Sequence, residues 1–172
     1  LLLSVLASCL ELKTDRCRIT VLDVGQGQCI LLQSDGETYV VDCGGSYDDD
    51  AADVAAATLL SQGVTQLDGI IVTHYDADHA GGAVHLLSRV SSKTLILPEG
   101  EDEKGFEEKL LSDFSGDVIR GDQNLQITWG DSIITVFASE YFGNSNETSL
   151  CVLFHEEECD ILITGDRGIL GE

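Results

Sequence analysis

Short apolar runs, broken by glycine and by acidic residues, make up most of the chain. In the first half, the segments rich in Ile, Val and Leu predict β-strands. These segments cover 18–24, 28–33, 39–42, 68–73 and 94–97. Asp35-Gly36 lies between the second and third segments and predicts a tight hairpin turn. The segment 68–73 has almost no polarity until its end, which is typical of a buried strand.

Helical spacing of apolar residues predicts helices over 51–62, 81–90 and 102–114. Asp50 is expected to cap the first of them, and Gly63 to end it. The second half then returns to predicted strands at 118–120, 124–129, 132–138, 149–155 and 159–164. Strands followed by alternating strands and helices, and then by more strands, predict an α/β or α+β sandwich.

The chain of 172 residues is long enough for one domain and carries a net charge of −22, from 31 acidic and 9 basic residues. Most of the acids lie in runs that are typical of solvated loops. Such a surface repels nucleic acid unless bound cations reverse the charge locally. No stripe of alternating basic and aromatic residues, of the kind that grips single strands, is present in the sequence.

The first ten residues form an apolar run that is too short to cross a bilayer alone. Three interpretations remain open: the end of a membrane helix, a lipoprotein signal ending at Cys9, or a core segment. Among the six cysteines no Cys-x-x-Cys pair occurs, which argues against a zinc ribbon. Three cysteines in strand-like runs, Cys29, Cys43 and Cys151, are expected to be buried, and a disulfide stays possible in an oxidising compartment.

Four potential metal ligands stand within six residues, directly after the buried strand 68–73. They are His74, Asp76, Asp78 and His79. Ligands at the end of a strand lie at the sheet edge where α/β folds place their sites. Mixed imidazole and carboxylate ligands suit zinc or manganese. The other two histidines, His85 and His155, are expected to be structural.

The pattern His-x-Asp-x-Asp-His over residues 74–79 resembles the second motif of the metallo-β-lactamase superfamily. Val41-Asp42-Cys43-Gly44-Gly45 resembles the first motif, and Ile163-Thr164-Gly165-Asp166 resembles the fourth. The resemblance implies a four-layer αββα sandwich that binds one or two metal ions at its edge. It also implies that Asp166 bridges two metals, whereas Asp42 steadies the site from behind the ligands.

A narrower resemblance is to the ComEC competence family of membrane DNA channels. The segment 19–29 is similar to that family's entry strand, and Asn146-Glu147-Thr148-Ser149-Leu150 to its Asn-x-x-Ser-Leu segment. The resemblance implies a domain that follows membrane helices, on the outer face of the cell membrane, and cleaves the DNA strand that is not imported. Residues 1–17 would then be the end of a membrane helix or a linker, and 18–172 the catalytic domain.

The chain departs from the superfamily pattern in three places. Asn144, Asn146 and Ser149 stand where many members have the third-motif histidine, and the ComEC-like pattern shares this absence. The fifth-motif histidine beyond Asp166 is also missing, so we expect a C-terminally incomplete domain with weak or no metal binding, testable by calorimetry against a longer version. Gln28 stands where the family commonly has aspartate.

These motifs predict two divalent cations, zinc or manganese. His74 and Asp76 would hold one, Asp78 and His79 the other, and Asp166 would bridge them. Asp78 is also expected to orient the attacking water or move a proton. The leading hypothesis is a nuclease domain of a DNA-uptake channel used in natural transformation. Two alternatives are a free or lipid-anchored hydrolase of a small ester, lactone or phosphodiester, and a non-catalytic scaffold or gate.

Overall fold

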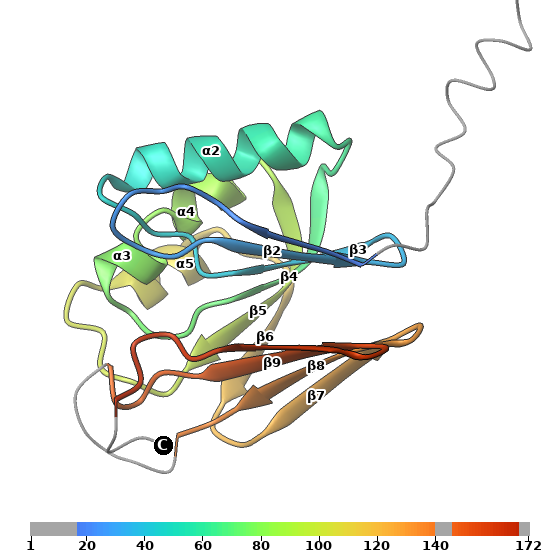
Figure 1. Cartoon of the computed structure of the whole chain (residues 1–172). Coiled ribbons are helices and arrows are strands. Elements are labelled where there is room, and N and C mark those ends of the chain that lie inside the picture. Colours follow the sequence, from blue (N-terminus) through green and yellow to red (C-terminus); the bar gives the residue numbers. More distant parts are fainter. Residues whose placement is uncertain (1–16, 140–145, 169–172) are drawn as a thin grey trace, which may run out of the picture.

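Two β-sheets lie face to face in the computed structural model, and helices cover the outer face of one of them (Figure 1). The structure describes residues 17–139 and 146–168. The apolar run at the N-terminus therefore lies outside the described residues, as does Asn144. Within the described ranges, no helix is long and apolar enough to cross a membrane.

The first sheet has six strands in the order of the chain. The strands are β1 (Arg18–Val21), β2 (Ile30–Ser34), β3 (Glu37–Val41), β4 (Gln66–Ile71), β5 (Ser91–Pro98) and β6 (Asp117–Gly121). The first three pair antiparallel, and the pairs from β3 to β6 are parallel. The predicted hairpin turn is confirmed, because Asp35 and Gly36 both have positive φ (47° and 80°).

Within residues 17–139 and 146–168, four helices pack on the outer face of this sheet. They are α2 (Asp48–Ser61), α3 (Ala77–Ala80), α4 (Ala83–Leu87) and α5 (Phe106–Ser112). The longest, α2, turns a row of alanines and Leu59 toward the sheet, where they are fully buried. Small side chains at this contact let the helix lie close to the strands, so the first core layer forms between helices and sheet.

The second sheet has four antiparallel strands and packs on the inner face of the first. They are β7 (Leu125–Trp129), β8 (Ser132–Phe137), β9 (Cys151–Glu156) and β10 (Cys159–Ile163), in the order β10-β9-β8-β7. Phe154 is fully buried between the sheets. Trp129 stacks on Tyr39 of the first sheet with 5.0 Å between ring centroids. The described residues thus form three layers of an αββα sandwich: helices, sheet and sheet.

Two helix predictions were wrong in detail. The backbone is already helical at Asp48, so Asp50 lies in the first turn rather than at the cap; acidic residues suit that whole turn because the helix N-terminus carries partial positive charge. The helix expected over 81–90 is shorter, because only α4 (Ala83–Leu87) lies in that range, and it is separate from α3, which ends at Ala80. The carbonyl oxygen of Asp78 accepts a hydrogen bond from Gln28 N (2.9 Å), and Gly82 N donates to Cys43 O (2.7 Å). These bonds replace the helical bond between residues 78 and 82.

Candidate metal centre

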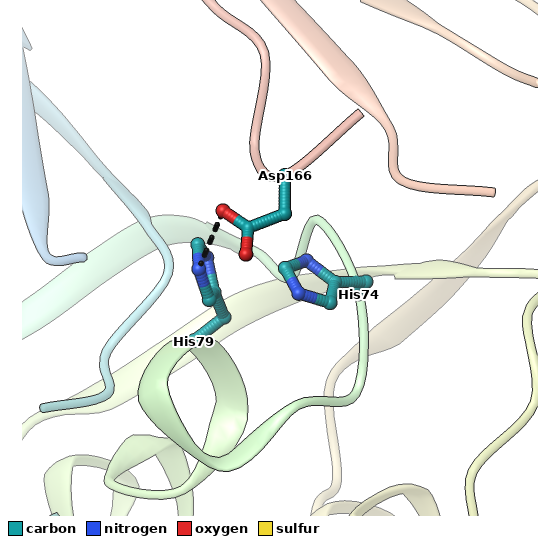
Figure 2. Close-up of side chains that lie close together, drawn as sticks. All are labelled: His74, His79 and Asp166. Carbon is teal, nitrogen blue, oxygen red and sulfur yellow. Dashed lines mark ion pairs between the residues drawn. The ribbon is translucent and has the colours of Figure 1, made fainter. Parts of the chain in front are cut away.

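Three side chains from separate segments converge at one edge of the sandwich. His74 follows β4, His79 lies on α3, and Asp166 follows β10; Figure 2 shows all three pointing toward one another. One ligand atom from each lies within 4.8 Å of the others. The two imidazole rings have centroids 4.1 Å apart. The segment that follows β4 of the first sheet thus meets the segment that follows β10 of the second sheet.

The buried His74 ring presents a free nitrogen to this cluster. Its Nδ1 lies 3.1 Å from Thr73 Oγ1, whose own proton goes to Asp42 Oδ2 at 2.7 Å. The Thr73 hydroxyl therefore accepts from Nδ1–H, which leaves the lone pair on Nε2. This Nε2 is buried and has no hydrogen-bond partner. Burial, followed by the neighbouring His79, lowers the pKa of His74, so the neutral form is favoured.

The His79 ring is held from behind by Asp42. Its Nδ1 lies 2.8 Å from Asp42 Oδ2, and its Nε2 lies 3.3 Å from Asp166 Oδ1. Burial opposes protonation of His79, but the hydrogen bond to Asp42 and the surrounding carboxylates raise its pKa overall. A carboxylate behind a histidine fixes the ring so that the other nitrogen faces the ligand site.

Asp42 is the fully buried acceptor that organises this edge. Its Oδ1 accepts from the Thr73 amide (2.7 Å), and its Oδ2 accepts from the Thr73 hydroxyl, His79 Nδ1 and Gln28 Nε2 (2.8 Å). Its φ of +59° is unusual for a residue other than glycine. The four hydrogen bonds offset that conformational cost and stabilise a buried carboxylate.

Two glycines permit the close approach of the segments that carry the ligands. A Cβ on Gly165 would lie 2.9 Å from Thr73 Oγ1, and φ there is +54°. A Cβ on Gly44 would lie 2.3 Å from the backbone nitrogen of His79. The amide of Leu150 also donates to the Thr73 carbonyl at 2.9 Å, which ties the second sheet to the end of β4.

The other predicted ligands lie nearby but outside the three-residue cluster. Asp76 is half exposed, with Oδ2 3.7 Å from His74 Nε2. Asp78 is partly buried and contributes its backbone oxygen to the loop of Gln28, as described above. Sequence alternation paired His74 with Asp76 and His79 with Asp78, whereas the structure brings the two histidines together around Asp166. The role of the Asp76 and Asp78 carboxylates stays a prediction.

The third-motif segment contacts the turn that carries Asp166. Ser149 is fully buried; its amide donates to Asn146 O at 3.0 Å, and its carbonyl accepts from Arg167. Sequence reasoning missed Thr73 and the polar role of Gln28. The only sequence signal for these two residues is their place at the ends of predicted strands: Gln28 begins 28–33, and Thr73 ends 68–73.

The three converging groups fit a divalent cation. The hydrogen bonds place a lone pair on Nε2 of His74 and, through Asp42, on Nε2 of His79, and both face the Asp166 carboxylate. Three acceptors around one point share no proton, so a cation among them would satisfy all three at once. Two imidazoles and a carboxylate form a set that zinc and manganese accept.

His85 and His155 lie away from this cluster. His85 is exposed on α4. His155 Nδ1 forms a surface ion pair with Asp160 at 2.6 Å, across the β9–β10 hairpin. Their positions agree with the structural role expected for both, and they serve below as control sites.

Comparison with known proteins agrees with the fold. The profile of the Metallo-beta-lactamase superfamily matches residues 22–171. The chain is 30% identical over 108 residues to ComE operon protein 3 of Bacillus subtilis (strain 168), covering 54% of this chain and 14% of that protein. It is 31% identical over 101 residues to Recombination protein 2 of Haemophilus influenzae, covering 56% and 13%. The chain thus spans about one-seventh of the length of these curated relatives.

Solved structures show the same architecture. Metallo-beta-lactamase SMB-1 superposes with a TM-score of 0.61 at 20% sequence identity, covering 87% of this chain and 62% of that one. Because the sequence motifs, the sandwich and the profile match coincide over most of the chain, the chain belongs to the metallo-beta-lactamase superfamily.

Proposed function

We propose that this domain is a metal-dependent phosphodiesterase that cleaves DNA, as the soluble part of a membrane DNA-uptake system on the outer face of the cell membrane. The fold supports a metal-dependent hydrolase in general. Similarity to two competence proteins favours DNA as the substrate. The observation that carries the proposal is the convergence of His74, His79 and Asp166, with the unpartnered Nε2 of His74 facing the other two.

The charge of the chain makes a cation necessary for this substrate. A net charge of −22 repels a phosphodiester, and Asp166 is itself exposed at the cluster. Divalent ions held here would act as Lewis acids and make water a usable nucleophile at neutral pH. A positive pocket would then meet DNA inside an otherwise acidic surface.

The residues of the chain have separable parts in this proposal. His74 and His79 would hold the metal through their imidazoles, and Asp166 would hold it through its carboxylate. Asp42 keeps the proton of His79 on Nδ1, so that Nε2 stays available. Asp78, in the first turn of α3, would accept the proton from the attacking water.

The experiment is cleavage of linear and single-stranded DNA by a C-terminally longer version of the protein, purified with manganese or zinc. We expect degradation that needs the divalent ion and is abolished by His74→Ala. His85→Ala is the matched control, because this histidine is exposed on α4 and outside the cluster; it should cleave at the wild-type rate.

The two other functions would give different results when lactones and small esters are tested beside DNA. Hydrolysis of lactones or small esters without any action on DNA would assign a small-molecule substrate to the same site. Bound metal without hydrolysis of DNA, lactones or esters, or no bound metal at all, would contradict the nuclease and favour a scaffold or gate.

A further inference from the structure

The geometry points to a disulfide-forming pair, Cys29 and Cys43. The bond would link the segment before β2 covalently to the end of β3, which carries Asp42. Nothing in the proposed hydrolysis uses either thiol. The pair lies one residue from two polar groups of the metal centre: Gln28 precedes Cys29, and Asp42 precedes Cys43.

The first observation is a bulge that places these cysteines opposite each other. Ile30 pairs with Val41 in the β2–β3 ladder, and Gly44 N donates to Gln28 O at 3.1 Å. Between these two points, the first strand has one residue, Cys29, whereas the second strand has two, Asp42 and Cys43. An extra residue of this kind is a β-bulge, and the positive φ of Asp42 lies within it.

The second observation is that both thiols point into the same core and touch. Each cysteine is fully buried in the layer between the helices and the first sheet. The neighbouring Cys43 thiol, together with burial, raises the pKa of Cys29. Both are reduced in the structure. They are therefore neighbouring free thiols in the core.

The backbone spacing suits the bond. Opposed residues of antiparallel strands have Cα atoms about 4.5–5.5 Å apart. Disulfides span Cα distances of about 4.4–6.8 Å, so closure needs side-chain rotation more than backbone movement. The bond would close a loop of roughly 15 residues around the Asp35-Gly36 hairpin and lower the entropy of the unfolded chain.

The reaction is a two-electron exchange with an external disulfide such as oxidised glutathione. The protein thiols give up two protons and two electrons, and the Cys29–Cys43 bond forms. The glutathione disulfide bond breaks, and the donor leaves as two thiols. Because both thiols of the folded pair are fully buried, exchange is expected while the hairpin is open, during folding or slow local unfolding.

Peptide mapping tests the pair directly in the whole protein. The protein is equilibrated with oxidised glutathione, denatured, alkylated and cleaved after arginine and glutamate, without reduction. Cleavage after Arg18 and Glu37 puts Cys17, Cys29 and Cys43 on three separate peptides, so the two peptides of Cys29 and Cys43 stay together only through a disulfide. We expect the linked peptides in the oxidised sample and their separation after reduction.

Thermal unfolding gives the second measurement. We expect the oxidised protein to melt a few degrees above the reduced protein, and Cys43→Ala to lose this difference. Cys151→Ala is the matched control, because this thiol is buried in the other sheet and bonds the carbonyl of Thr164; it should keep the difference. Full alkylation of Cys29 and Cys43 after equilibration with excess oxidised glutathione, or bonding of either to Cys17 or Cys159, would overturn the proposal. Neither result would bear on DNA cleavage.

Discussion

Replacing Asp42 by asparagine isolates the group that holds His79 in place. The side chain keeps its shape but loses one acceptor and the charge. Four donors surround the wild-type carboxylate: the Thr73 amide and hydroxyl, Gln28 Nε2 and His79 Nδ1. In either orientation of the asparagine, its NH₂ group meets at least one of these donors, so a buried donor loses its partner.

The size of the effect follows from these contacts. An unsatisfied buried group costs about 1–3 kcal/mol. At roughly 2–4 °C per kcal/mol for a chain of this length, the melting temperature should fall by about 2–12 °C. The pKa of His79 should also fall, because the hydrogen bond and charge of Asp42 raise it in the wild type. Loss of this support should weaken zinc or manganese binding by about 10–100-fold.

The assay combines thermal unfolding, an NMR pH titration of the histidines and metal titration by calorimetry. Asp53→Asn is the matched control: Asp53 is exposed and paired only with Arg89 at the surface, where such pairs contribute about 0–1 kcal/mol. A folded Asp42→Asn protein with wild-type metal affinity and an unchanged His79 pKa would refute the role assigned to Asp42.

Three further predictions concern the scaffold. Arg120 lowers the pKa of Glu107 below its usual value near 4.5. The stability that this pair adds is therefore present above about pH 4.5 and is lost as the pH falls through the lowered pKa. Urea unfolding of Glu107→Gln should differ from that of the wild type at about pH 7 but converge with it in acid. Gly44→Ala should displace the start of α3, because its Cβ would lie 2.3 Å from His79 N, and metal affinity should fall together with the melting temperature. Phe154→Ala should lower the free energy of unfolding by about 3–5 kcal/mol, since this ring is fully buried between the sheets, and denaturant titration would measure it.

Much of the fold could be predicted because its signals are local. The Asp35-Gly36 turn depends on two residues that tolerate positive φ, and the structure has both. The strands of the second sheet were placed to within about two residues by their apolar patterns. Helix bounds were predicted less well, because the break at Gly82 is caused by a hydrogen bond to Cys43, a residue distant in the sequence.

The sequence located the candidate site but did not predict how its side chains are arranged. The spacing from His74 to His79 marks a ligand-bearing loop, and alternation along an extended chain places Asp76 near His74, but it does not show that His79 and Asp166 also meet His74. Their arrangement depends on a bulge at Asp42 and on α3 beginning at Ala77, which turns His79 back toward His74. Such contacts are tertiary, so a periodic pattern does not contain them.

The central claim is that His74, His79 and Asp166 hold a divalent metal. Calorimetric titration of a C-terminally longer version with zinc and with manganese tests it most directly, on the wild type and on His74→Ala, His79→Ala and Asp166→Ala, with His155→Ala as the control from the surface hairpin. We predict that each of the three substitutions weakens binding at least tenfold, whereas His155→Ala leaves it unchanged. Binding that is equally strong in all four variants would contradict the account.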